Sequence, residues 1–357
     1  MKDKKLSVLM FDAAFPPPII GGKEKQAYLL SQELIRNGID VMALSYVHNS
    51  NKTELIGKLS IERVKKDLLG FAYLPLFLLK MKAKHNILHI HTPSRIGVSL
   101  LIVGKLLGYK TVFKFPNENM LDNKNSISGK IWKLIVKKSD MLITLERSTY
   151  SKLLKENFIE KKIFNVSNGV EISKIKKNTK KKNIELIFLG RLVPQKKCDD
   201  LLKACEKLDE NFKNWHLSIV GEGYLYDDLV SLSVELGIDK KVDFVGYQSN
   251  TMEWLKKSDI FVISSEREGM SNSMLEAMSI GLPIVTTKVS STEEMLGKDY
   301  EFAVDIGDVD SLASKIFKLS SDINKRRDIS KFIYDRCVEK FSIKSVAKKY
   351  IERYKEL

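Results

Sequence analysis

The chain has 357 residues, of which 43% are hydrophobic and 29% are charged, with 8 prolines and 3 cysteines. This balance predicts a soluble globular protein of two domains and argues against general disorder, because there are enough apolar residues for two cores. The formal net charge of +15 predicts attraction to phosphate in nucleic acid, anionic lipid or phosphorylated substrates, without choosing among them.

The N-terminal apolar stretch is short and leads to Asp12, which suits a buried strand better than a signal peptide. No uncharged apolar run reaches the length of about 20 residues that spans a bilayer, so we expect a cytoplasmic protein. Cys198 and Cys205 would lie about 10 Å apart along one helix, too far for a disulfide. With Cys337, they are predicted to be reduced structural thiols.

Short runs rich in Val, Ile and Leu alternate with helix-length segments along the whole chain. This alternation is typical of parallel sheets covered on both faces, so we expect an α/β fold with two doubly wound, Rossmann-like domains. Ligands of such sheets lie beyond the carboxyl ends of the strands, and two sheets favour a cleft between them. The expected strands are Leu6–Phe11, Val41–Leu44, Ile87–Ile90, Thr111–Phe115, Met141–Thr144, Ile184–Leu189, His216–Val220, Val242–Val245, Ile260–Ile263 and Pro283–Thr286.

A lysine-rich segment at residues 174–183, KIKKNTKKKN, is interpreted as a solvated linker. It would separate an N-terminal domain over residues 1–173 from a C-terminal domain over residues 184–340. Residues 341–357 contain a one-sided apolar helix, Ile343–Lys355, which must dock. We expect it to pack back on the N-terminal domain.

The first candidate site follows the first strand, where Gly21 and Gly22 precede a helix expected over Lys25–Asn37. Consecutive glycines at a helix start let the backbone approach a phosphate. The pattern is neither a dinucleotide fingerprint nor a P-loop, and a tight turn for packing explains it equally well.

The second candidate site is GRLVPQK, residues 190–196, after the first strand of the second domain. Arg191 and Lys196 suit a diphosphate, and they could stabilise charge on a departing phosphate where a metal would otherwise serve. The alternative is a basic loop in a basic protein.

The densest cluster is SSEREGMSNSMLEAMSIGLP, residues 264–283, which contains Glu268 and Glu276. Glu268 would lie at a strand end, and Glu276 about two turns into the following helix. Carboxylates accept hydrogen bonds from hydroxyls, which suits ribose and hexose. The alternative is two surface glutamates.

Three patterns are given less weight as sites. Asp308-Val309-Asp310 resembles a metal-binding Asp-x-Asp, but it opens a helix, where Asp is favoured as a cap. His89 and His91 would share one strand face without an evident third metal ligand, which leaves a cleft role for His91. Gly221-Glu222-Gly223 lacks the third glycine of a dinucleotide fingerprint.

Two basic and apolar stretches, Lys65–Lys84 and Lys130–Lys138, would suit helices lying on anionic lipid. The alternative is an ordinary core-facing helix with a charged outer side. Pro75 argues against one continuous helix in the first stretch.

Taken in order, these segments resemble the family 4 retaining glycosyltransferases, which have the GT-B fold. The resemblance covers nearly the whole chain. It is strongest at EREGMSNSMLEAMSIGLPIV, which looks like the family's Glu-x7-Glu signature. The other matching segments are PPPIIGGKEKQAYLLSQELIRNGIDV, VSNGVEI, FLGRLVPQKK, IVGEGYLYDDL, VDFVGYQSN and FSIKSVAKKYIERYKEL.

The resemblance implies that Arg191 and Lys196 hold the donor diphosphate, that Glu276 binds the ribose and that Glu268 contacts the transferred sugar. Arg191, Lys196 and Glu268 would be the catalytic residues. It implies neither a metal nor a cofactor besides the donor. The further donor-binding residues that it implies are Gly21, Gly22, Gly246, Tyr247, Gln248, Gly269, Met270 and Ser271.

The chain departs from the family pattern on the acceptor side. Many members have a His after the fourth strand of the first domain, and this chain reads VFKFPNEN there. The candidates for the acceptor side are His91, Lys114, Asn117 and Glu118. Lys197 also occupies a position where the family commonly has Gly.

The resemblance therefore implies a metal-independent retaining hexosyltransferase. It would transfer a sugar from a nucleotide diphosphate to a hydroxyl acceptor in polysaccharide or lipid-linked glycan synthesis for the capsule or cell envelope. It would be cytoplasmic, with a peripheral location on the inner face of an anionic membrane left open. One alternative is a sugar-nucleotide-modifying enzyme such as an epimerase. A nucleic-acid-binding protein is disfavoured, because the lysines are scattered and aromatic stacking motifs are not evident.

Overall fold

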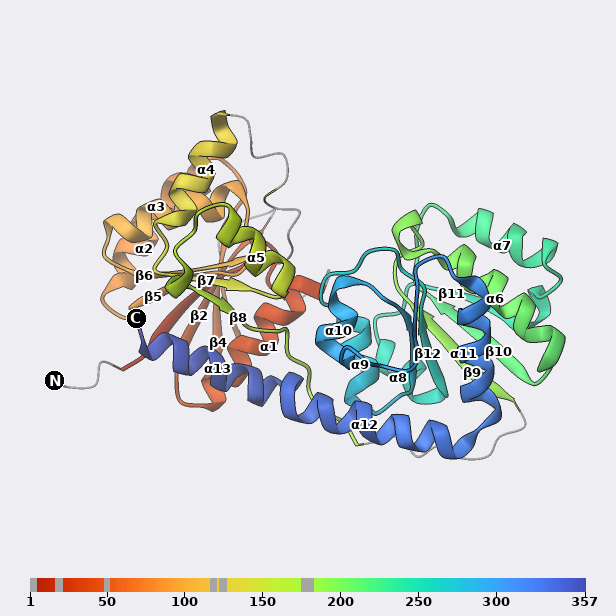
Figure 1. The fold of residues 1–357 in the computed structure, drawn as a ribbon. Coiled ribbons are helices and arrows are strands. Elements are labelled where there is room, and N and C mark those ends of the chain that lie inside the picture. The colour runs from red at the N-terminus through yellow and green to blue at the C-terminus, as the bar shows by residue number, and fades with distance from the viewer. Residues whose placement is uncertain (1–4, 17–21, 48–51, 116–120, 122–126, 175–182) are drawn as a thin grey trace. The chain divides into compact units, whose positions relative to one another are not determined.

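The computed structural model describes residues 5–16, 22–47, 52–115, 121, 127–174 and 183–357. They form two compact units (Figure 1). The first comprises Met1–Gly169 together with Ile343–Leu357, and the second comprises Val170–Ser342. Most of the lysine-rich segment that we interpret as a linker lies outside the described residues.

The first unit contains an eight-stranded sheet in the order β3-β4-β2-β1-β5-β6-β7-β8. Its pairings are parallel except that β3 runs antiparallel to β4. The strands are β1 (Ser7–Phe11), β2 (Asp40–Val47), β3 (Lys52–Ile56), β4 (Leu59–Lys65), β5 (Ile87–Ile90), β6 (Lys110–Phe115), β7 (Met141–Thr144) and β8 (Ile163–Asn165).

Helices cover both faces of this sheet, as the alternation of side chains along the strands requires. Leu9 and Phe11 of β1 belong to one buried cluster, and Val8 and Met10 belong to the other. The first cluster is covered by α2 (Leu68–Lys82), α3 (Arg95–Leu106), α4 (Ile127–Lys137) and α5 (Arg147–Lys155). The second is covered by α1 (Gly22–Arg36) and α13 (Ile343–Lys355).

The last helix, α13, packs on α1 of the first unit. It buries Val346, Ala347, Tyr350 and Tyr354 in the second cluster. The Tyr354 hydroxyl lies 2.6 Å from Nδ1 of His89, inside that core. The predicted return of the C-terminal helix to the first unit is therefore confirmed.

The second unit contains a six-stranded parallel sheet in the order β11-β10-β9-β12-β13-β14. The strands are β9 (Ile184–Leu189), β10 (Trp215–Val220), β11 (Val242–Gly246), β12 (Ile260–Ile263), β13 (Ile284–Thr287) and β14 (Ala303–Val304). The helices are α6 (Cys198–Asn211), α7 (Tyr226–Glu235), α8 (Thr251–Lys257), α9 (Asn272–Ser279), α10 (Ser290–Leu296), α11 (Val309–Ser321) and α12 (Ile323–Phe341). The predicted pair of doubly wound parallel sheets is confirmed.

The three cysteines are buried and free, as expected from their spacing. In contrast to the sequence analysis, α2 continues through Pro75. Pro75 is exposed on the outer side of the helix, so its ring does not enter the core. Among the helices that the structure describes, none combines the length and apolar composition needed to cross a bilayer.

Candidate functional site

The loops after β9 and β12 bring Lys196 and Glu268 together. These strands are adjacent and parallel, so their carboxyl ends meet at one edge of the sheet. Lys196 ends a short 3-10 turn, Pro194–Lys196, and its amine forms an ion pair with the Glu268 carboxylate. Ser265 Oγ donates to the same carboxylate oxygen at 3.2 Å. The two charged side chains are only 14% and 11% exposed, so the pair is largely shielded from water.

Backbone hydrogen bonds fix the two loops against each other. Gln195 is central, because its carbonyl accepts from the Glu266 N–H at 3.0 Å and its side-chain amide donates to the Arg267 carbonyl at 2.7 Å. Ser264 Oγ donates to the Lys196 carbonyl at 3.1 Å. Lys196 is therefore held in place before any ligand arrives.

The loop that carries Arg191 is positioned by glycines that the sequence analysis discounts. A Cβ atom on Gly221 would lie 1.9 Å from the Gly190 carbonyl oxygen, and one on Gly223 would lie 2.0 Å from that of Leu192. Only glycine permits this approach of two backbones. Arg191 is exposed at the strand end and takes no part in the Lys196–Glu268 ion pair.

Glu276 is buried on α9, and its Oε2 accepts a hydrogen bond from Thr251 Oγ1 at 2.8 Å. The helix starts at Asn272, so Glu276 lies about one turn into it rather than the predicted two. The helix starts later because Ser271 is its cap and accepts from the Met274 N–H. Of the other predicted donor ligands nearby, Met270 is buried and Gly269 is half-buried.

The loop of Gly246, Tyr247 and Gln248, which the resemblance places among the donor-binding residues, is tied to the same edge through Glu222. Glu222 Oε1 accepts from the Tyr247 N–H at 3.3 Å, and the Gly221 N–H donates to the Gly246 carbonyl at 2.9 Å. Gly246 has a φ of 75°, which favours glycine. The Tyr247 side chain is 60% exposed, and the Gln248 side chain is bound to the Val245 carbonyl at 3.4 Å.

The carboxyl edge of the first sheet holds a buried polar cluster around Lys114. The Lys114 amine lies 3.0 Å from His91 Nε2 and 3.1 Å from Asn168 Oδ1. Asp12 follows β1 at the same edge, where Thr92 Oγ1 donates to its carboxylate at 2.5 Å. All four of Asp12, His91, Lys114 and Asn168 are buried.

Burial shifts the pKa of each titratable group in this cluster toward its neutral form. It lowers the pKa of Lys114 to about 7, against a smaller opposing effect of the Asp12 charge. It raises the pKa of Asp12 to about 6, and it lowers the pKa of His91. The tautomer of His91 decides which of the two nitrogens, Lys114 Nζ or His91 Nε2, donates in this contact. The cluster can therefore exchange protons near neutral pH.

His91 and Lys114 are among the site residues predicted from the sequence, whereas Asp12 and Asn168 are not. Asp12 could have been found, because a carboxylate directly after the apolar run Val8–Phe11 of a buried strand is unusual. Gly22 is exposed at the start of α1. The remaining candidates, Gly21, Asn117 and Glu118, lie outside the described residues.

The patterns that were given less weight have structural roles. Asp308 accepts from the Ser311 N–H at 2.9 Å and caps α11, while Asp310 pairs with Lys207 at 2.6 Å. His89 and His91 do share one face, with ring centroids 5.7 Å apart, but His89 is bound to the Tyr354 hydroxyl. Within the described part of the chain, no group of three or more His, Cys, Asp or Glu could hold a metal. Metal independence stays a prediction.

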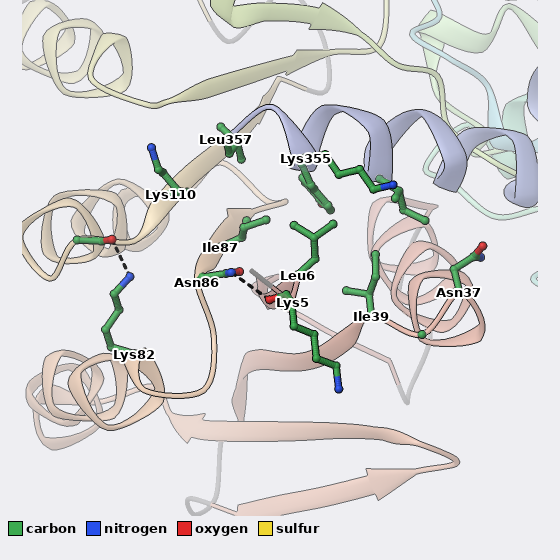
Figure 2. A pocket seen from close by; sticks show the side chains of 14 residues that line it. Lys5, Leu6, Asn37, Ile39, Lys82, Asn86, Ile87, Lys110, Lys355 and Leu357 are labelled. Carbon is green, nitrogen blue, oxygen red and sulfur yellow. Dashed lines mark hydrogen bonds between the residues drawn. The ribbon is translucent and has the colours of Figure 1, made fainter. Parts of the chain in front are cut away.

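A pocket of about 680 Å³ lies at the opposite, amino edge of the first sheet (Figure 2). Its lining mixes apolar side chains with lysines: Leu6, Ile39, Ile87, Leu357, Lys5, Lys110 and Lys355. Lys82 turns to the Gly108 carbonyl at 2.6 Å. Because ligands of parallel sheets bind at the carboxyl edge, we do not place a reaction here.

Residues 170–336 match the family model described as "Glycosyl transferases group 1". The UDP-Gal:alpha-D-GlcNAc-diphosphoundecaprenol alpha-1,3-galactosyltransferase of Escherichia coli is 28% identical over 269 residues, which is 69% of each chain. The lipopolysaccharide core biosynthesis glycosyltransferase LpsE of Rhizobium meliloti is 30% identical over 47% of this chain and 48% of its own length. Among solved structures, Anabaena HepE in complex with UDP and glucose has a TM-score of 0.78 at 15% identity, and the match covers 99% of this chain and all of HepE.

Proposed function

We propose a donor, an acceptor and residue roles for this chain, which is a family 4 glycosyltransferase of the hexosyltransferase type with the GT-B fold. The donor is a nucleoside diphosphate sugar. Uridine diphosphate is the first nucleotide to test, because the Escherichia coli relative is named for UDP-Gal and HepE was solved with UDP and glucose. The acceptor is a hydroxyl of a lipid-linked glycan or growing envelope polysaccharide, the class suggested by the names of both sequence relatives.

The observation that carries the proposal is the preformed Lys196–Glu268 pair at the carboxyl edge of the second sheet. Lys196 and Arg191 bind the diphosphate and stabilise the charge that grows on it as the sugar–phosphate bond breaks. Glu268 accepts hydrogen bonds from the sugar, and Glu276 accepts them from the ribose. The backbone of Gly269, Met270 and Ser271, before α9, approaches the sugar and phosphate.

The acceptor oxygen attacks the anomeric carbon on the face from which the diphosphate leaves, so the anomeric configuration is retained. The acceptor hydroxyl passes its proton to the departing phosphate. No protein nucleophile and no metal ion are used. The second unit binds the donor in this scheme.

The first unit receives the acceptor in the same proposal. Lys114 takes the place of the histidine that many family members carry, supported by His91 and Asp12. Its buried position and its pKa of about 7 suit a group that orients a hydroxyl and shares a proton.

A thermal-shift series with nucleoside diphosphates and their sugars, each with and without EDTA, tests the donor. We expect UDP to raise the Tm of the full chain, with the same shift in EDTA. No shift with any nucleoside diphosphate would contradict the proposal. Incubation with the donor sugar alone, followed by NMR, separates transfer from epimerisation, because an epimerase would return an isomerised sugar nucleotide without any acceptor.

A further inference from the structure

Helix α2 of the first unit has an apolar outer side. Its inner side buries Leu74, Phe77, Leu78 and Met81 in the core. On its outer side, Leu68 is 83%, Leu76 66% and Leu79 58% exposed. A helix that is apolar on both sides is normally covered on both sides.

The neighbouring helices extend this apolar side. Helix α3 packs against both α2 and α4, and Figure 1 shows the three next to one another. Ile102 and Leu106 of α3 are 42% and 82% exposed, and Ile131 and Leu134 of α4 are 51% and 61% exposed. In the second unit, by contrast, the described helices expose at most two large apolar residues each, on α7 and α12, against five on α2. We call the outer side of α2, α3 and α4 the apolar-basic face.

The charges on this face are all of one sign. None of the three helices contains Asp or Glu. Their basic residues are Lys80, Lys82, Arg95, Lys105, Lys130, Lys133 and Lys137. Lys105 and Lys133 pair with Asp140 and Glu156, which lie outside the helices, whereas Lys80 and Lys130 are exposed beside the leucines and isoleucines.

We propose that the apolar-basic face docks on an anionic membrane, with α2, α3 and α4 lying along the surface. The exposed leucines and isoleucines enter the boundary between headgroups and acyl chains, and the lysines contact lipid phosphates. Charge complementarity favours an anionic membrane over a second copy of the chain as the partner of this face. A symmetric dimer through this face would set the same lysines against each other without any acid from these helices.

Docking by the apolar-basic face would serve the proposed lipid-linked acceptor, and only this purpose of docking rests on the proposed function. Helices α2 and α3 begin just after β4 and β5, so their first residues lie at the carboxyl edge of the sheet, as do His91 and Lys114. Docking by this face would therefore bring the acceptor edge near the membrane surface, where the sugar of a lipid-linked acceptor is held.

Vesicle flotation of the full chain tests the docking, with phosphatidylcholine alone and with an equal mixture of phosphatidylcholine and phosphatidylglycerol. We expect binding to the mixture, weakened by salt, and at least about tenfold weaker binding of the Leu76→Ser/Leu79→Ser variant. The Lys80→Gln/Lys130→Gln variant should lose most of its preference for the anionic vesicles. Val234→Ser on α7, a position that is 60% exposed in the second unit, is the matched control and should bind like the wild type.

Equal binding of the wild type and the Leu76→Ser/Leu79→Ser variant would overturn the proposal, as would no binding to the mixed vesicles. Sedimentation showing a wild-type dimer that this variant abolishes would identify the face as a contact between copies and also overturn it. The thermal shift with UDP is measured on the same samples. A failure of docking is thereby distinguished from a failure of the proposed donor.

Discussion

Lys114 and Lys196 occupy equivalent places in the two units, at or just beyond the carboxyl end of a parallel strand. Their partners differ in charge. Lys196 is ion-paired with the carboxylate of Glu268. Lys114 faces the imidazole nitrogen of His91 and the amide oxygen of Asn168, and burial lowers its pKa to about 7. One residue type is thus a cation held by a carboxylate at one sheet and an amine that is about half protonated near pH 7 at the other.

The strongest test of this contrast removes the paired cation. Lys196→Met and Glu268→Gln should each lower transfer about 10²–10³-fold, because each removes a group that we propose contacts the diphosphate or the reacting sugar. Release of the nucleoside diphosphate from the donor, in the presence of an acceptor, measures the rate. Glu266→Gln, at an exposed position in the same loop, should keep nearly full activity. Wild-type rates in both site variants would refute the assignment of the donor site.

The second test removes the buried amine. Lys114→Met should lower transfer about 10²-fold or more, because the acceptor hydroxyl would lose the group that we propose orients it. The Tm shift produced by UDP should stay at the wild-type value, since donor binding is assigned to the second unit. A variant that loses the Tm shift together with transfer would show that Lys114 does not act on the acceptor alone.

The third test uses the pH dependence of unfolding. The pKa of Lys114 is lower in the folded chain than in the unfolded one, so the unfolded chain binds more protons between about pH 7 and pH 10. Lys114 therefore makes the free energy of unfolding rise with pH, by at most about 1.4 kcal/mol per pH unit. The difference between wild type and Lys114→Met in urea unfolding should show this slope. A difference in the free energy of unfolding that does not change with pH would mean that the pKa of Lys114 is the same in the folded and unfolded chains.

Asp12 should behave with the opposite sign. Its pKa is raised to about 6 in the folded chain, so its contribution to stability is complete below its ordinary value and is lost as pH rises through 6. Asp12→Asn should remove this loss between about pH 4 and pH 6. Urea unfolding of both proteins across that pH range provides the measurement. If the free energies of unfolding of the two proteins change with pH in the same way, the pKa of Asp12 is not raised.

The smallest expected effect comes from a third lysine next to the ion pair. Lys197 has a φ of 48° and a ψ of 44°, a left-handed conformation that strains a residue with a side chain. Lys197→Gly should raise the free energy of unfolding by about 0.5 kcal/mol, since relief of strain exceeds the added chain entropy. Its partners Asp199, which is half-buried, and Asp200, which is buried, lie 3.5 and 3.6 Å from its amine, and ion pairs this long contribute little.

Urea unfolding measures this change, and activity should stay at the wild-type level, because the amine of Lys197 points to its own helix rather than to Glu268. Lys203→Gly, inside α6, is the control and should destabilise by about 1 kcal/mol. A loss of activity in Lys197→Gly would mean that the left-handed turn itself positions Lys196.

Strands that are buried on both faces could be predicted because almost every residue in them is apolar, as in β5, β7 and β12. The hairpin of β3 and β4 could not be predicted in this way, because polar and charged residues interrupt the apolar residues of both strands. Only Gly57, with a φ of 61°, marks its turn. The two-residue β14 is too short to leave a pattern.

The candidate residues of the donor side could be named from the sequence because they lie in short, recognisable segments, and their roles stay predictions. The acceptor side could be predicted only in part. Lys114 and Asn168 are 54 residues apart, and their contact depends on how β6 pairs with β7 and β7 with β8. A sequence pattern carries no information about such a contact until the strand order is known.

The position of α13 has a consequence for how the protein is made. The first unit needs Ile343–Leu357 to cover its sheet, whereas Val170–Ser342 form the second unit from one continuous stretch. During synthesis the second unit can therefore finish folding first. The first unit, with His89 still lacking Tyr354, stays incomplete until the ribosome has released the last helix. Through this interval its α13-binding surface is open to chaperones.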